Sequence, residues 1–106
     1  MANAVRVSDR ARGPFIGTYT GTTAAQNIHI GFKPAYMIIS NITDGDTVCF
    51  WHASSVTTYV AVTTAAATVT AGVTQVDDGT VIGFSLASDA VLNENAKVYH
   101  FIAFPA

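Results

Sequence analysis

Residues 35–52 read AYMIISNITDGDTVCFWH, and this stretch decides the fold class. Two apolar runs, 35–42 and 47–52, flank the dipeptide Asp44-Gly45. Glycine adopts the positive φ that a tight turn needs, so Asp-Gly between apolar runs is a strong signal for a β-hairpin. The first run is apolar at both odd and even positions, which favours a central place in a sheet. We therefore predict a hairpin of two strands.

Side-chain alternation shows which residues of the second strand share a face, because neighbouring side chains in an extended strand point to opposite sides. The residues on one face are Thr47, Cys49 and Trp51, and those on the other face are Val48, Phe50 and His52. Cys49 and His52 point apart and cannot form a nucleophile pair within this strand. A lone cysteine among apolar neighbours is typically a small buried hydrophobe, which we predict for Cys49.

Strand-like runs continue along the chain, separated by Gly, Pro and Asp-Gly signals. They are FIGTYTGT (15–22), QNIHIGF (26–32), TVIGFSL (80–86) and KVYHFIAF (97–104). Residues 53–76 add two or three strands with turns near Ala65 and Gly72, because their many Thr and Val residues oppose a helix. Residues 88–96 read as a polar loop with one short helical turn. We predict one all-β domain over 15–106, a β-sandwich or jelly roll of about eight short antiparallel strands.

The first 14 residues form a separate unit in this interpretation, an extended basic arm. The chain has 106 residues, only 11% of them charged, and a formal net charge of −2, which argues against a general nucleic-acid binder. The arm contains three arginines, Arg6, Arg10 and Arg12, and only one acidic residue, Asp9. A basic arm ahead of an acidic body is suited to docking on an acidic partner surface or on nucleic acid.

Cysteine usage and apolar run length indicate the compartment. One cysteine excludes an internal disulfide. No apolar run reaches the length that spans a bilayer, and the start MANAVRVSDRARG lacks the apolar core of a secretory signal. We expect synthesis in a reducing cytoplasm without export, and no membrane partner.

The middle of the chain, residues 53–76, carries no formal charge. Exposed strands without Lys or Glu would pair with other edges and aggregate. Such a surface is tolerated when further copies or a larger assembly cover it, since interface cores are depleted in charge. We predict a homodimer or homotrimer, and the candidate self-association surface is Val56, Thr58, Val60 and Val62, which share one strand face.

Catalytic and metal-binding patterns are weak. Asp44 and Asp46 lack the spacing and closing Glu of a calcium loop. His29, His52 and His100 do not form the close pairs typical of zinc sites. His29 is predicted to be exposed, and His100 to lie at an interior or interface position beside apolar neighbours. Only one Glu is present, and neither a nucleophile elbow nor a phosphate-binding glycine loop occurs. The sequence therefore predicts a non-enzymatic protein without a cofactor or metal.

Aromatic residues offer an alternative function, a carbohydrate- or receptor-binding module. Aromatic rings on an exposed face can stack on sugar rings. Trp51 and Tyr59 are the candidate stacking residues.

Two segments of the chain resemble small structural proteins of tailed bacteriophages and prophages. They are GFKPAYMIISNITDGDTVCFWH, with a Gly-Phe-x-Pro turn before an apolar strand, and VLNENAKVYHFIAF, which is similar to a closing Val-Asn-x-x-x-x-x-Tyr-x-x-x-Ala-Phe strand. The chain departs from that pattern by reading Val-Leu-Asn at 91–93.

The resemblance implies a virion component, either a head-decoration protein or a tail-fibre domain. For a decoration protein it implies binding to the major capsid protein on the outer head surface, with the arginines of the arm as capsid contacts and neutral strands packed against sister copies. In this interpretation the protein stabilises the shell by adding buried area across joints between capsid subunits.

Overall fold

The chain folds into two stacked β-sheets, as a computed structural model shows for residues 5–6, 14–55, 57–63, 67–88 and 91–105. The ten strands are β1 (Val5–Arg6), β2 (Phe15–Thr20), β3 (Gln26–His29), β4 (Pro34–Asn41), β5 (Thr47–His52), β6 (Thr58–Thr63), β7 (Ala67–Ala71), β8 (Val73–Asp77), β9 (Ile82–Leu86) and β10 (Val98–Pro105). The only helical element among these residues is a 3₁₀ turn at Ala53–Ser55. The predicted all-β sandwich is confirmed, with ten strands rather than about eight.

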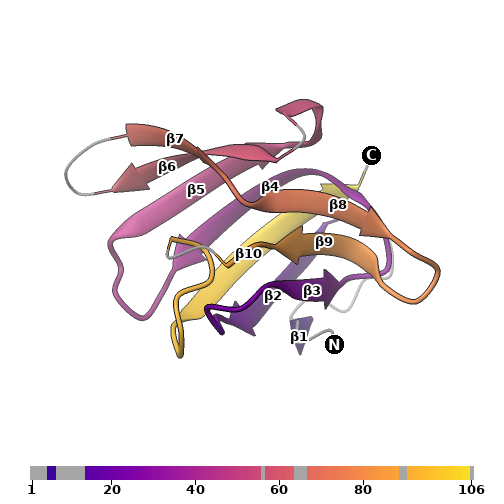
Figure 1. Cartoon of the computed structure of the whole chain (residues 1–106), viewed down its shortest axis with the longest axis horizontal. Helices are drawn as coiled ribbons and strands as arrows, with labels where there is room; N and C mark the ends of the chain where they lie inside the picture. Colours follow the sequence, from indigo (N-terminus) through magenta and orange to yellow (C-terminus); the bar gives the residue numbers. More distant parts are fainter. Residues whose placement is uncertain (1–4, 7–13, 56, 64–66, 89–90, 106) are drawn as a thin grey trace.

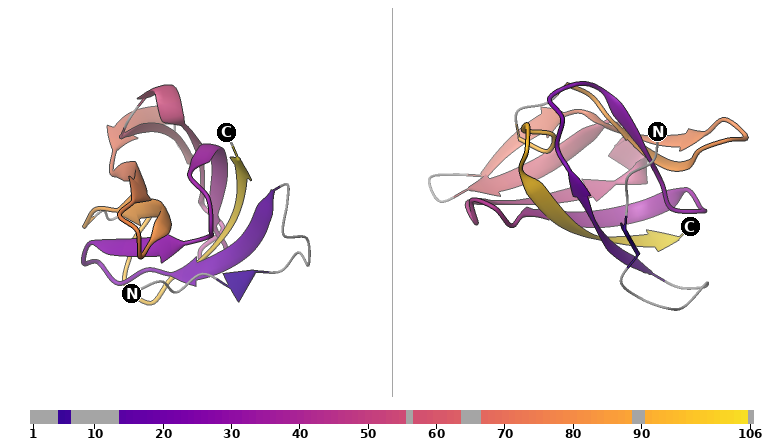
Figure 2. Two further views of the ribbon diagram at one scale, coloured as in Figure 1. Left: turned by 90° about the vertical axis from the view of Figure 1, so that its right-hand side faces the viewer. Right: turned by 90° about the horizontal axis from the view of Figure 1, so that it is seen from below.

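The two sheets differ in size. The large sheet has seven strands in the order β1-β2-β10-β4-β5-β6-β7, and the small sheet has three in the order β3-β9-β8. All pairs are antiparallel. Figure 1 shows the small sheet in front of the β2, β10 and β4 part of the large sheet, and Figure 2 shows the two layers from the side and from below. As predicted, the run 35–42 lies centrally, because β4 is the fourth of the seven strands.

The predicted hairpin is present as β4 and β5. Gly45 has a φ of +69°, the left-handed conformation that favours glycine. The side chain of Asn41 closes the turn, since its Oδ1 accepts a hydrogen bond from the Asp44 amide at 3.0 Å and its Nδ2 donates to the Asp44 carboxylate at 3.2 Å. The Asp44 carboxylate also pairs with Lys97 at 3.1 Å, which connects the turn to the residue before β10. The Asp-Gly signal therefore predicted the place of this turn and the positive φ of its glycine, whereas the contacts of Asn41 and Lys97 were not predicted.

The other predicted turns have mixed outcomes. Gly72 separates β7 from β8, where the chain passes from the large sheet to the small one. Asp78 forms a second turn by accepting hydrogen bonds from the Thr80 and Val81 amides, and these bonds lower the pKa of its carboxyl group. The turn near Ala65 lies outside the described residues. The short helical turn expected within 88–96 is absent from the described part, which contains only hydrogen-bonded turns and bends.

The core follows the predicted alternation. Cys49 and Trp51 are each 1% exposed, whereas Val48, Phe50 and His52 are exposed on the opposite face. The buried thiol confirms that Cys49 packs as a small hydrophobe. His29 is exposed, as predicted. His100 is also exposed, so the interior position considered for it is wrong: β10 buries Tyr99, Phe101 and Ala103 and turns the alternate residues outward.

Asn93 is completely buried and forms hydrogen bonds with both polar ends of its amide. Its Nδ2 donates to the carbonyl oxygens of Ala24 at 2.6 Å and Ala87 at 3.0 Å. Its Oδ1 accepts from the Thr22 amide at 2.9 Å and from Gln26 at 2.7 Å. These bonds connect the β2–β3 loop with the loop that precedes β10. A buried amide with complete pairing fixes these loops because any displacement would leave polar groups unsatisfied.

Two buried tyrosines also form hydrogen bonds with the loop that precedes β10. Tyr19 donates a hydrogen bond from its hydroxyl to the Leu92 carbonyl at 2.7 Å, and Tyr99 donates to the Val91 carbonyl at 2.9 Å. Their rings stack with centroids 5.0 Å apart and planes within 10°. The rings fill the core while the hydroxyl groups satisfy loop carbonyls, which is the usual arrangement of a buried tyrosine.

Replacement of Asn93 by alanine is expected to lower the free energy of unfolding by about 2–4 kcal/mol, because it leaves buried donors and acceptors without partners. Urea denaturation followed by circular dichroism measures this change. The matched control is Asn95→Ala, because Asn95 is exposed in the same loop and surface substitutions shift stability by less than about 0.5 kcal/mol. Equal stability of the two variants would contradict the role assigned to the Asn93 amide.

Candidate interaction surface

The outward face of the large sheet carries a continuous apolar row across six strands. The register pairs Ile16 with Ile102, Ile102 with Ile38, Ile38 with Phe50, Phe50 with Val60, and Val60 with Val69. Ile16, Ile102, Ile38, Phe50 and Val60 point away from the small sheet, because their strand neighbours occupy the buried face. Val69 is paired with Val60 and is exposed. We call this set the apolar row.

A second row runs beside the apolar row on the same face. Its members in strand order are Thr18, His100, Ser40, Val48, Val62 and Ala67. It is polar over β2, β10 and β4 and becomes apolar over β5, β6 and β7. The outward face of the large sheet, which we call the outer face, therefore combines β-branched side chains with hydroxyl and imidazole groups.

Most of the exposed apolar side chains of the described chain belong to this outer face. Eight large hydrophobic residues are exposed, and seven of them lie there: Ile16, Val48, Phe50, Val60, Val62, Val69 and Val98. Ile42, which follows β4, is the eighth. Phe50 is 38% exposed and Val69 is 70% exposed. Contiguous exposed apolar residues make the outer face the candidate interaction surface of the described chain.

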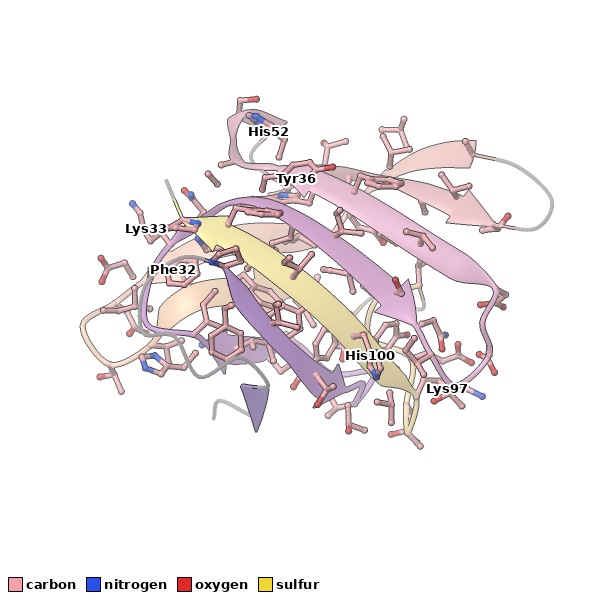
Figure 3. The ribbon with its side chains drawn as sticks, turned by 180° about the vertical axis from the view of Figure 1, so that it is seen from behind. Phe32, Lys33, Tyr36, His52, Lys97 and His100 are labelled. Atoms are coloured by element: carbon pink, nitrogen blue, oxygen red, sulfur yellow. The ribbon has the colours of Figure 1, made fainter. Side chains whose placement is uncertain are left out.

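No described residue of the outer face carries a formal charge. The two lysines lie at opposite ends of this face, as Figure 3 shows for Lys33 and Lys97. Lys97 is held by Asp44, and its hydrogen bond to that carboxylate raises the pKa of the ammonium group. The charges of the body therefore flank the apolar surface rather than interrupt it.

Two shallow hollows shape the outer face. One, of about 400 Å³, lies over β10 and is lined by Ile16, Ile38 and Ile102 together with Thr18, Ser40 and His100. The other, of about 350 Å³, is lined by Phe50, Val60 and Val69 together with Tyr36, His52 and Thr58. Ile38 borders the first hollow and its cross-strand neighbour Phe50 borders the second. This neighbouring pair therefore lies where the two hollows adjoin, and we call it the Ile38–Phe50 ridge.

An aromatic cluster occupies one end of the outer face. The ring of Tyr36 lies 6.0 Å from that of Phe104 and 6.3 Å from that of His52, measured between centroids. Figure 3 shows Tyr36 and His52 beside each other at this end, away from His100. The Nδ1 atom of His52 accepts a hydrogen bond from the Ser54 amide at 3.1 Å, which orients the imidazole. This cluster contains ring faces and few hydrogen-bonding groups.

The structure places the predicted self-association residues as follows. Val60 and Val62 are exposed on the outer face, and Thr58 is half-buried at the rim of the second hollow. Val56 lies outside the described residues. Their role in self-association stays a prediction. Sequence reasoning missed Ile16, Ile38 and Ile102, which belong to strands distant in the chain; the two-sided apolar pattern of 35–42 was the one available signal.

The candidate sugar-stacking residues are not on a surface. Trp51 and Tyr59 are each 1% exposed, because they lie on the inner faces of β5 and β6. Both residues border the second hollow, but a side chain that is 1% exposed offers no ring face for a sugar to stack on, so the structure contradicts this assignment. The exposed aromatic residues of the outer face are Phe50 and, partly, Tyr36 and Phe104.

The histidines and acidic residues do not converge. His29 lies on the small sheet, where its Nδ1 accepts a hydrogen bond from the Ile82 amide at 3.0 Å, while His52 and His100 lie on separate parts of the large sheet. Among the residues that the structure describes, no group of three or more His, Cys, Asp or Glu side chains is arranged to hold a metal ion. In the same part of the chain, none of the helical structure has the length and apolarity to cross a membrane.

No known protein family matches the chain, and no curated protein or solved structure is detectably similar to it.

The Cys49 thiol is expected to react with a water-soluble disulfide reagent at least about a hundredfold more slowly in the folded protein than in 8 M urea, because a core thiol is exposed only when the surrounding structure opens. Stopped-flow absorbance measures the rates. A Thr74→Cys variant provides the control, since Thr74 is exposed on β8 and its new thiol should react at once. Rapid labelling of Cys49 in the folded wild type would instead indicate an accessible, functional thiol.

Proposed function

We propose that the chain is a non-enzymatic structural protein of a phage virion, a capsid decoration protein that binds the outer surface of the head. The outer face of the large sheet carries this proposal. It exposes apolar side chains across six strands without a formal charge among its described residues, which suits a building block of an assembly.

The resemblance to phage structural proteins supports the proposal through residues that determine the fold. Gly31 has a φ of +91° directly before β4, and Pro34 begins that strand. Asn93 fixes two loops, and Tyr99 and Ala103 are buried in β10. The residues of the resemblance therefore have structural roles in this fold. The virion assignment itself comes from the phage proteins in which the same pattern occurs.

The arm supplies the contact to the capsid in this proposal. Val5 and Arg6 pair with β2 at Thr18 and Gly17, so the arm joins the large sheet at its edge. Arg10 and Arg12 lie outside the described residues. Three arginines against one aspartate give the arm a positive charge that attracts an acidic capsid surface. The partner is the major capsid protein, and the domain adds buried area across joints between its subunits.

A tail-fibre or host-adhesion module that binds carbohydrate is the second candidate. The hollow beside Tyr36, Phe50 and His52 favours it, because partly exposed rings are suitable for stacking on sugars. Sugar recognition also uses convergent polar groups that accept and donate hydrogen bonds. Carboxylates and carboxamides are absent from the described residues lining this hollow, so decoration remains the favoured function.

Co-sedimentation with phage heads tests the decoration function. The heads are assembled from the major capsid protein encoded in the same genome, without this chain. Wild-type protein is expected to sediment with them. The combined substitution Arg6→Ala, Arg10→Ala and Arg12→Ala should weaken binding about tenfold, because three surface ion pairs at about 0.5 kcal/mol each amount to roughly 1.4 kcal/mol.

The control variant is Lys33→Ala, which removes a positive charge from the exposed rim of the body and should leave head binding unchanged. Failure of the wild type to sediment with heads at low ionic strength would contradict the decoration function. Binding to a glycan array that is lost in Tyr36→Ala would support the second candidate in its place.

A further inference from the structure

We infer that two copies of this chain pair through the outer faces of their large sheets, around a two-fold axis near the Ile38–Phe50 ridge. The inference deepens the proposed function by naming the surface and the partner of self-association. The self-association surface predicted from the sequence was one strand face around Val60. The inference enlarges this surface to the outer face, which extends from β2 to β7.

The need for a cover follows from the composition of the apolar row. On the inner face of the large sheet, Met37, Trp51 and Tyr99 are buried. On the outer face, no described residue of the chain covers Phe50, Val60 or Val69. Two sheets that pack face to face with interdigitating apolar side chains form the standard core of a β-sandwich. A second outer face provides such a layer with side chains of the same kind.

The absence of charge favours a second copy over a different protein. A two-fold interface brings the same patch of both partners together, so a charged group near the axis would face its own copy. The described outer face contains no such group, and Lys33 and Lys97 lie at its ends. A face designed for an unlike protein usually carries charges that steer and select that partner. The charge pattern therefore fits self-pairing.

The two hollows of the outer face give apolar side chains of a second copy a place to pack. The Ile38–Phe50 ridge stands between a hollow of about 400 Å³ over β10 and a hollow of about 350 Å³ over β5 and β6. In the two-fold arrangement that we infer, Ile38 and Phe50 of each copy would enter a hollow of the other. A self-complementary patch of this kind is the requirement for an isologous dimer.

The available area is sufficient for a reversible dimer. Six strands about 4.8 Å apart span about 24 Å, and the outward residues of β10 extend over about 20 Å, so each face offers about 500 Å² in projection. Two faces together bury about 1,000 Å², the lower end of specific protein–protein interfaces. The dimer should therefore form in the micromolar range and dissociate on dilution.

Sedimentation velocity of the full chain between about 1 and 200 µM tests the inference. The wild type is expected to shift from monomer to dimer and to reach a plateau at the dimer. Phe50→Lys should raise the dissociation constant more than about tenfold, equivalent to more than 1.4 kcal/mol, because it places a charge at the centre of the face. Thr74→Lys is the matched control, since it adds the same charge to β8 in the small sheet and should leave the dimer intact.

A charge-reversal pair tests the two-fold arrangement. Phe50→Lys and Phe50→Glu are each expected to sediment as monomers, and their equimolar mixture should form dimers because opposite charges then meet near the axis. Unchanged circular dichroism and urea midpoints show that the variants are folded, as expected for substitutions at a side chain that is 38% exposed.

The inference is overturned if the wild type stays monomeric at 200 µM, or if Phe50→Lys associates as tightly as the wild type. It is also overturned if Phe50→Lys loses head binding while the wild type remains monomeric, because the face would then bind the capsid directly. A wild-type dimer that does not bind heads would support the inference and contradict only the decoration function.

Discussion

The large sheet is apolar on both of its faces, and the described chain covers only the inner one. The three central strands β10, β4 and β5 present Tyr99, Met37 and Trp51 inward and Ile102, Ile38 and Phe50 outward. The small sheet has three strands and lies over the inner face. No described element lies over the outer face. Our proposals for function and self-association both depend on this exposed face.

The loop before β10 makes this arrangement rigid. Asn93 joins it to the β2–β3 loop, while Tyr19 and Tyr99 hold the carbonyls of Leu92 and Val91. Gly21 is required beside this loop, because a Cβ atom there would collide with the backbone of Glu94. Because β2 and β10 are neighbours, these contacts also hold the Ile16–Ile102 pair in the outer face. A rigid, flat-sided scaffold loses little conformational entropy when it assembles.

Local signals predicted much of the fold. Asp44-Gly45 predicted the hairpin, the apolar neighbours of Cys49 predicted its burial, and Gly72 predicted a turn at the point where the chain passes between the sheets. The candidate site was predicted only in part, because strand order decides which outward residues become neighbours. Side-chain alternation shows that Thr47, Cys49 and Trp51 share a face, but it does not show that this face is covered. Trp51 was therefore misassigned to a ligand surface. Asn93 stood in a polar run, where nothing local indicates complete burial.

Thiol accessibility at Val60 tests the central claim most directly. In a Val60→Cys variant the new thiol lies in the apolar row beside Phe50, and Cys49 stays in the core as an internal reference. The account predicts that alkylation of this thiol slows as protein concentration rises through the dimerisation range, while a Thr74→Cys thiol on β8 reacts at one rate throughout. Equal alkylation rates at position 60 in dilute and concentrated protein would contradict the claim that a second copy covers this face.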